Sequence, residues 1–221
     1  MIFYTSSGLQ LYYEVSGNGS PVILLHGNGE SGRTFNEHAK FLSVKHTVYV
    51  IDSRCHGRSD RAAQISYALM AQDLKEFIVG VKITNPAVFG SSDGGIVALI
   101  AAKDYGGLLG PIIVAGANLY PDGLKRSALF GMKFLYFLTR NKRLLMSIKE
   151  PDILPEELFN VKNRTLVLAG EFDMVKTEHT KLIAASLPNS SLIIIKGENH
   201  FSYVGKPVVL CKIIEDFLNN N

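Results

Sequence analysis

Short apolar runs recur along the chain and are separated by segments of helical spacing. The runs are nearly continuous, which is typical of strands buried on both faces of a sheet, and cover residues 22–25, 47–51, 87–89, 111–115, 166–169 and 192–195. Amphipathic helical spacing occurs between them, at residues 33–42, 67–79, 94–105, 177–186 and 208–218. Residues 2–5 and 9–15 flank the turn Ser6-Ser7-Gly8 and predict an antiparallel hairpin at one edge. The pattern predicts an α/β fold with a mostly parallel central sheet flanked by helices.

One interval lacks the strand pattern. Residues 119–161 show only helical spacing, at 124–138 and 142–148. We interpret 119–161 as a small helical cap inserted above the sheet. The chain of 221 residues otherwise suits a single domain over residues 1–221, because one α/β unit commonly reaches this length.

The first part of the predicted cap, residues 119–149, is strongly basic. The whole chain has a net charge of +3, whereas residues 119–149 combine seven basic side chains with one acidic side chain, Asp122. These residues therefore carry +6 and the rest of the chain carries −3. The basic residues are Lys125, Arg126, Lys133, Arg140, Lys142, Arg143 and Lys149. We expect a solvated face, with a lid that touches anionic substrates or a membrane surface as the alternative.

Composition excludes several classes of protein. Hydrophobic residues make up 47% of the chain and charged residues 19%, enough apolar surface for a large core. No basic tract with interleaved aromatics indicates nucleic-acid binding, and no apolar run approaches the roughly 20 residues that span a bilayer. The first residues lack a signal-peptide pattern, and Cys55 and Cys211 suggest reduced thiols. We therefore expect a cytoplasmic protein whose partner is a small molecule.

The main chemical signal is Gly90-x-Ser92-x-Gly94, placed between an apolar run and a helical segment. A sharp turn from strand to helix forces its central residue into a strained backbone conformation, and small residues on either side let the neighbouring chain pass. Such a turn lifts the Ser92 hydroxyl above the sheet, at the positive end of the following helix. Ser92 is the candidate nucleophile.

A serine nucleophile needs a base, and the base needs an acid that orients it. In this arrangement both follow the serine, on loops beyond later strands, in the order Ser, acid, His. Asp173 lies a few residues after the run at 166–169, and His200 lies after the run at 192–195. His179 falls inside a predicted helix, where we expect a surface role.

Stabilising an oxyanion needs main-chain amides beside the nucleophile. The run at 22–25 leads into His26-Gly27-Asn28-Gly29, where the glycines allow close approach of the backbone to a substrate. We predict the amides of Asn28 and Asp93 as the two donors, and a structural hydrogen bond within the loop for His26.

Together these motifs resemble the α/β-hydrolase superfamily over nearly the whole chain outside 119–161, where that family carries a variable cap. The motifs are the loop 26–29, the loop Asp52-Ser53-Arg54-Cys55-His56-Gly57-Arg58-Ser59, the elbow with Asp93-Gly94-Gly95, and the late Asp173 and His200. The resemblance implies Ser92, Asp173 and His200 as a triad, with the Asn28 and Asp93 amides as oxyanion hole. The elbow is similar to that of valacyclovir hydrolase-like amino-acid-ester hydrolases, in which the Asp after the nucleophile holds the α-ammonium of the substrate. The cap here is much shorter than in that branch.

These residues predict a serine hydrolase that cleaves a small carboxylic ester through an acyl-enzyme, with no metal or organic cofactor. A serine at position 92 argues against the dehalogenase and epoxide-hydrolase branches, which use a carboxylate nucleophile. We expect Gly27, Asp93 and Phe134 to contact substrate, with Phe134 one of several apolar cap residues forming an acyl or alcohol pocket. We expect Arg54, His56 and Arg58 to fix their own loop.

Two alternatives stay open. An Asp93 that points into the pocket would favour amino-acid esters or short amides. A protein of this family can also keep the triad and serve mainly as a ligand receptor. The sequence leaves the oligomeric state open, and the apolar cap could equally form a dimer surface.

Overall fold

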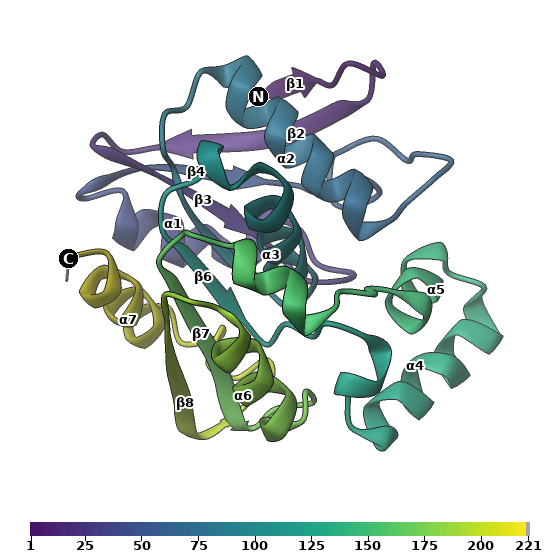
Figure 1. Ribbon diagram of the computed structural model, residues 1–221. Helices are drawn as coiled ribbons and strands as arrows, with labels where there is room; N and C mark the ends of the chain where they lie inside the picture. Colours follow the sequence, from purple (N-terminus) through teal and green to yellow (C-terminus); the bar gives the residue numbers. More distant parts are fainter. Residues whose placement is uncertain (220–221) are drawn as a thin grey trace.

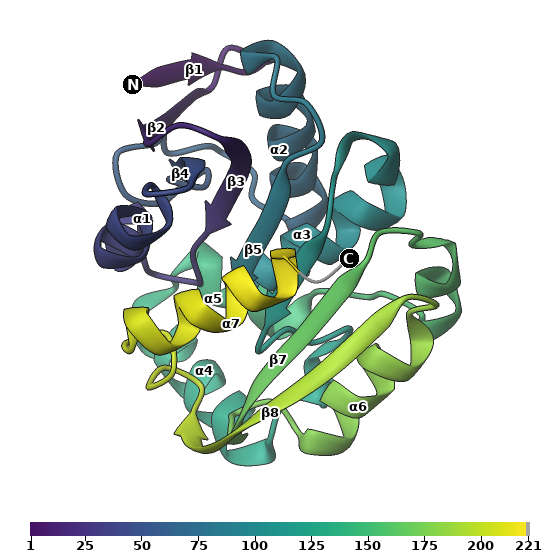
Figure 2. The same cartoon turned by 90° about the vertical axis from the view of Figure 1, so that its left-hand side faces the viewer.

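The fold is built on one sheet, seen in a computed structural model that describes residues 1–219; residues 220 and 221, the last two of the predicted domain, lie outside the described residues. The strands are β1 (Ile2–Tyr4), β2 (Gln10–Ser16), β3 (Ser20–Leu25), β4 (His46–Ile51), β5 (Ala87–Ser91), β6 (Ile112–Ala115), β7 (Thr165–Phe172) and β8 (Ser190–Asn199). Within the described chain they form an eight-stranded sheet of order β1-β2-β4-β3-β5-β6-β7-β8. Figure 1 labels all of them except β5, which is labelled in Figure 2. β2 pairs antiparallel with β1 and β4. The pairs β4-β3, β3-β5, β5-β6, β6-β7 and β7-β8 are parallel. The predicted mostly parallel sheet with an antiparallel start is confirmed.

Helices cover both faces of the sheet. They are α1 (Asn36–Leu42), α2 (Tyr67–Val81), α3 (Asp93–Tyr105), α4 (Arg126–Thr139), α5 (Lys142–Lys149), α6 (Thr177–Ser186) and α7 (Pro207–Asn219). The shorter 3₁₀ segments are η1 (Gly32–Phe35), η2 (Gly106–Leu108), η3 (Pro121–Gly123) and η4 (Pro155–Asn160). α1 and α7 pack on one face, and α2, α3 and α6 on the other (Figure 2).

The apolar runs are continuous because successive residues enter two different cores. In β3, Val22 and Leu24 join the core under α1 and α7, whereas Ile23 and Leu25 join the core under α2 and α3. All four are at most 3% exposed. Alternate side chains of a strand point to opposite faces, so both faces must be apolar when both are covered.

β8 departs from this rule. Ser190 and Ser191 are exposed, and Ile193 is 38% exposed. The expectation of burial on both faces is wrong for this strand, because β8 is the last strand of the sheet and pairs only with β7 within residues 1–219. An edge strand has less neighbouring chain to cover it.

The cap segment, residues 119–161, joins β6 to β7 and contains α4 and α5. The helices predicted at 124–138 and 142–148 are confirmed within one or two residues at each end. α4 and α5 pack against each other, set apart from the helices that flank the sheet (Figure 1). Every residue of α4 is described, and none is buried. Among the described residues, no helix combines the length and apolar character needed to cross a membrane.

Candidate active site

The turn between β5 and α3 places Ser92 in a strained conformation, with φ 53° and ψ −116°. A positive φ is unfavourable for a residue with a side chain and persists only where the surroundings enforce it. The Ser92 amide donates to the carbonyl of Ala115 on β6 at 2.7 Å. A Cβ on Gly90 would lie 2.1 Å from the carbonyl oxygen of Gly94, and one on Gly94 would lie 2.1 Å from that of Leu25. The turn therefore requires glycine at both positions.

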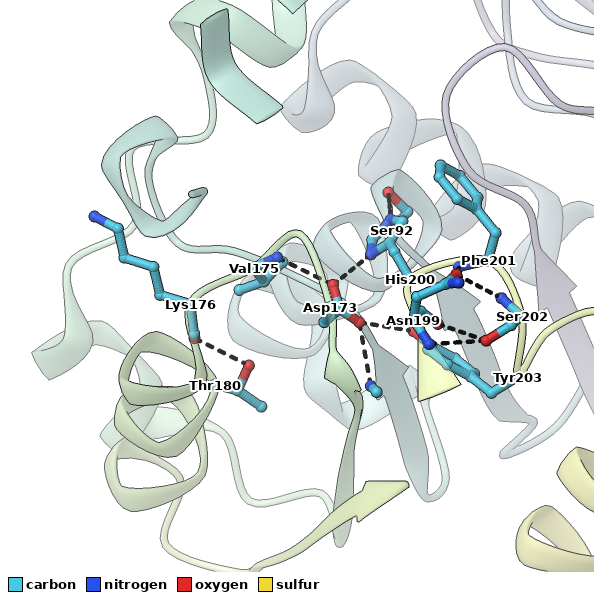
Figure 3. A network of polar contacts seen from close by, with 11 residues as sticks. Ser92, Asp173, Val175, Lys176, Thr180, Asn199, His200, Phe201, Ser202 and Tyr203 are labelled. Atoms are coloured by element: carbon cyan, nitrogen blue, oxygen red, sulfur yellow. Dashed lines mark hydrogen bonds and ion pairs between the residues drawn. The ribbon is translucent and has the colours of Figure 1, made fainter. Parts of the chain in front are cut away.

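Three side chains meet beyond the carboxyl ends of β5, β7 and β8. The Ser92 Oγ lies 3.0 Å from His200 Nε2, and His200 Nδ1 lies 2.6 Å from Asp173 Oδ1 (Figure 3). They come together because the carboxyl ends of parallel strands share one edge of the sheet. The structure thus places the three predicted residues in one hydrogen-bonded chain. This geometry can pass the serine proton to the imidazole.

Asp173 is buried and held by hydrogen bonds. Its carboxylate accepts from the amide of Val175 at 3.0 Å and of Gly170 at 3.3 Å, besides His200. Burial raises the pKa of Asp173, but the hydrogen bond from His200 and those from the amides outweigh it, and the pKa lies below its ordinary value. An ionised Asp173 accepts the Nδ1 proton and leaves Nε2 free to accept from Ser92. The hydroxyl of Tyr203, which sequence reasoning missed, donates to the same carboxylate at 3.5 Å (Figure 3).

The loop after β3 runs beside the nucleophile. A Cβ on Gly27 would lie 3.1 Å from the Cβ of Ser92, so glycine allows this approach. Gly27, Asn28 and Asp93 line the same cavity as Ser92. Within residues 1–219 the structure gives no acceptor for the main-chain amides of Asn28 and Asp93. His26 lies within the loop as expected: its Nδ1 donates to the Gly27 carbonyl at 2.8 Å.

A polar network joins this loop and the elbow to the cap segment. The Asn28 side-chain amide donates to the Ser147 hydroxyl at 2.8 Å and to the Arg143 carbonyl at 3.0 Å, both on α5. The Tyr67 hydroxyl lies 3.1 Å from Ser147 Oγ and donates to Asp93 Oδ1 at 2.8 Å. Sequence reasoning missed Tyr67 and Ser147, which no motif marks. The network holds α5 against the site.

Asp93 is an unusual carboxylate. It is 4% exposed, and within the described chain its Oδ2 has no hydrogen-bond partner. Burial raises the pKa of Asp93 to about 6, although the hydrogen bond from Tyr67 and the nearby side-chain amide of Asn28 oppose the shift. Leaving a buried polar atom unpaired costs about 1–3 kcal/mol. A donor or a cation on a bound molecule would remove that cost.

The site opens into a cavity of about 350 Å³. Its apolar wall comes from the cap segment and from the loops after β7 and β8, and consists of Leu124, Met132, Leu144, Met174, Phe201 and Val204. The expectation for Phe134 is wrong, because this residue is 57% exposed and does not line the cavity. Successive helical residues are turned by about 100°, so Phe134 points to the side of α4 away from Met132. Other apolar residues of α4 are also expected in the pocket. All residues of this helix are described, and among them only Met132 lines the cavity.

His179 is buried, although a surface role is expected from the sequence. It is 6% exposed, and its Nε2 accepts from the amide of Leu119 at 2.9 Å. Burial lowers the pKa of His179 to about 4, with a further contribution from Lys176. The expected surface role is therefore wrong, and His179 fastens the start of the cap segment.

The loop 52–59 matches its expected structural role. The Arg54 guanidinium forms a buried, bidentate ion pair with Asp73 of α2, with both N–O distances 2.6 Å. His56 Nδ1 bonds the Arg54 carbonyl at 2.9 Å, and Arg58 pairs with Glu14 at 2.5 Å. Each interaction fixes the loop 52–59 to itself or to a neighbouring helix or strand.

The sheet order, the elbow turn and the cap between β6 and β7 define an α/β-hydrolase fold. A sequence model of the alpha/beta hydrolase family matches residues 22–161, and the chain belongs to this family. The matched residues include Ser92 and end before Asp173 and His200. The placement of those two residues beside Ser92 comes from the structure.

Relatives extend the match over the rest of the chain. Serine hydrolase BPHL of Homo sapiens is 28% identical over an alignment of 246 residues that covers 96% of this chain and 84% of BPHL. The esterase EaEST from Exiguobacterium antarcticum has a similar structure, with a TM-score of 0.87 at 19% identity over 100% of this chain and 99% of that one. The enol-lactonase from Burkholderia xenovorans LB400 gives a TM-score of 0.82 at 15% identity over the full length of both chains. Both structural similarities concern the fold.

Proposed function

We propose that the protein is a serine hydrolase that cleaves a small carboxylic ester through an acyl-enzyme intermediate. The observation that carries this proposal is the chain of contacts from Ser92 Oγ to His200 Nε2 at 3.0 Å and from His200 Nδ1 to Asp173 Oδ1 at 2.6 Å. Nucleophile, base and orienting acid need this geometry. The similarity to a protein named serine hydrolase supports the same reaction class.

In the proposed reaction, His200 Nε2 takes the proton of Ser92 as the hydroxyl attacks the acyl carbon. Asp173 holds the imidazole and stabilises its charged form. The amides of Asn28 and Asp93 stabilise the oxyanion, since each is free to donate. His200 then protonates the leaving alcohol, and a water molecule activated by the same residue releases the acid.

The cavity supports a small and partly apolar substrate. A volume of about 350 Å³ lies at the lower end of ligand-binding pockets, and side chains such as Met132, Leu144 and Phe201 supply apolar surface. A short acyl or alcohol group suits these dimensions.

Labelling and turnover test the proposal together. Wild type and Ser92→Ala are incubated with a fluorophosphonate probe and with p-nitrophenyl acetate and butyrate. We expect labelling and turnover in the wild type, and loss of both in the variant by about 10⁴-fold or more. Labelling without turnover of any ester would favour a ligand receptor that retains the triad. Absence of labelling in a folded wild type would remove the serine mechanism.

A second candidate substrate class rests on Asp93. Its Oδ2 is buried, unpaired within the described chain and belongs to a residue that lines the cavity. An α-ammonium would pair with it, which favours amino-acid esters or short amides. We expect preference for an α-amino ester over its des-amino analogue, and loss of that preference in Asp93→Asn. Equal kcat/KM for the two esters in the wild type would eliminate this candidate.

A further inference from the structure

The outer side of α4 carries a stripe of exposed apolar side chains. Phe130, Phe134 and Phe137 follow the spacing i, i+4, i+7, and Leu138 lies beside them. They are 73%, 57%, 65% and 61% exposed. With about 100° between successive residues, the four fall within one arc of about 100°. We call these four residues the α4 stripe.

Basic residues run along one flank of the α4 stripe. Arg126 and Lys133 are seven residues apart, which keeps them on one line of the helix next to Phe130. Arg140 follows the last residue of α4, and its guanidinium lies 5.4 Å from the centre of the Phe137 ring. All three are exposed. They belong to the seven cations of residues 119–149, none of which forms an ion pair with a carboxylate in the part of the chain that the structure describes. Residues 119–149 of the cap segment therefore present apolar surface and cations without an ion-pair partner together.

We infer that α4 docks this protein onto an anionic membrane surface, with the α4 stripe in the lipid interface and the basic flank on the headgroups. A short helix with an aromatic and aliphatic stripe and a cationic flank lies in the plane of the interface, held by apolar burial and by attraction to acidic lipids. α4 has 14 residues and is about 21 Å long, which suits a helix lying along the surface. This docking does not depend on the Ser92 chemistry.

Charge favours an anionic membrane over a second copy of the chain as the partner of the α4 stripe. A two-fold dimer through the α4 stripe would bring the same surface of each copy together. Each copy would then place the +6 of residues 119–149 against the +6 of its partner. The rest of the chain carries −3, so residues 119–149 are the part of the protein that an anionic bilayer attracts most strongly.

The opposite side of α4 faces the proposed active site. Met132 lines the cavity, whereas Phe130 and Phe137 do not. Membrane docking through the stripe would therefore leave the cavity wall in place. Substitutions in the stripe can be separated from effects on turnover of soluble esters.

The apolar contribution is tested by vesicle co-sedimentation. Wild-type protein is mixed at low ionic strength with phosphatidylcholine vesicles that contain phosphatidylserine, and with phosphatidylcholine vesicles alone. We expect binding that requires phosphatidylserine and that Phe130→Ser/Phe137→Ser weakens by about tenfold or more. Phe159→Ser is the matched control, because Phe159 is 59% exposed on η4, away from α4. It should bind like the wild type.

The electrostatic contribution is tested by Arg126→Glu/Lys133→Glu. Arg126 is the first residue of α4, where glutamate suits the helix, so this variant should keep the cap folded. We expect about tenfold weaker binding or more, since cations near an anionic bilayer contribute to binding and glutamates at the same positions are repelled. Lys181→Glu/Lys212→Glu makes the same charge change at exposed lysines of α6 and α7 and should bind more tightly than the cap variant.

Three results would overturn the inference. One is a wild type that stays in solution with anionic vesicles at low ionic strength. Another is binding that Phe130→Ser/Phe137→Ser does not weaken more than Phe159→Ser. The third is a wild type that sediments as a dimer while Phe130→Ser/Phe137→Ser sediments as a monomer. The α4 stripe would then bind a second copy of the chain. Ser92→Ala should bind vesicles like the wild type, so failure of the proposed catalysis and failure of the docking are distinguishable.

Discussion

Replacing Asp93 by asparagine should make the free energy of unfolding less dependent on pH. The carboxylate is 4% exposed, and burial raises its pKa from an ordinary 3.8 to about 6. Below pH 3.8 the group is protonated in both the folded and the unfolded chain, and burial then costs no ionisation energy. As the pH rises towards 6, the unfolded chain releases its proton first, so the free energy of unfolding falls.

The size of the effect follows from the pKa difference. A shift of about two pKa units corresponds to ~3 kcal/mol once both states are ionised, above about pH 6. Between pH 4.5 and 7.5 the wild type should lose roughly 2 kcal/mol of this contribution, and Asp93→Asn should lose none of it. The asparagine can still accept from Tyr67, although its amide nitrogen takes the place of the unpaired Oδ2 at a cost that does not vary with pH.

The assay is urea denaturation of both proteins at several pH values from 4.5 to 7.5. The quantity compared is the difference in free energy of unfolding between the two proteins, which cancels the titration of the other groups. Asp152→Asn, at an exposed carboxylate, controls for the loss of one negative charge. A difference between wild type and Asp93→Asn that stays constant with pH would refute the reasoning.

Two further predictions concern backbone fit and a buried charge. Gly94→Ala should destabilise the fold by about 4 kcal/mol or more in thermal and urea unfolding, because its Cβ would lie 2.1 Å from the Leu25 carbonyl oxygen. At Gly107 the new Cβ would meet no atom within 4 Å beyond the adjoining residues of the chain. Gly107→Ala should therefore change stability by less than about 0.5 kcal/mol, and equal effects of the two substitutions would contradict the steric argument. Arg54→Ala should cost about 3–5 kcal/mol by urea denaturation, because it leaves Asp73 buried without its ion-pair partner. Adding Asp73→Asn to Arg54→Ala should restore part of the lost free energy of unfolding, and no recovery would contradict the charge argument.

Most of the fold could be predicted because burial on both faces of a parallel sheet leaves a continuous apolar signature. In β3 that signature reflects two cores, and the same reasoning failed for β8, whose place at the edge depends on the order of strands rather than on its own residues. The positions of Ser92, Asp173 and His200 followed from chain order and from the shared edge of the sheet. Their catalytic roles stay predictions.

The contacts between the cap segment and the helices that flank the sheet could not be predicted. Tyr67 and Ser147 are separated by 80 residues, and each would pass for an ordinary helical residue. Spacing gives a helix its apolar faces but does not say which face turns inward. Both Met132 and Phe134 are therefore expected in the pocket from the sequence, and only Met132 lines it. The burial of His179 could not be predicted for a similar reason. The residue that bonds to its ring, Leu119, belongs to a distant part of the sequence.

The bonds from Asn28 to α5 limit how freely the cap can be exchanged during evolution or engineering. The residue proposed to present an oxyanion amide is fastened by its side chain to the Ser147 hydroxyl and the Arg143 carbonyl. A cap transplanted from a relative would bring a new pocket wall and also remove this anchor. A chimera of this protein with a relative's cap would therefore need a hydroxyl at position 147 and a helix placed like α5. Only then should it combine the turnover rate of this protein with the substrate specificity of the relative.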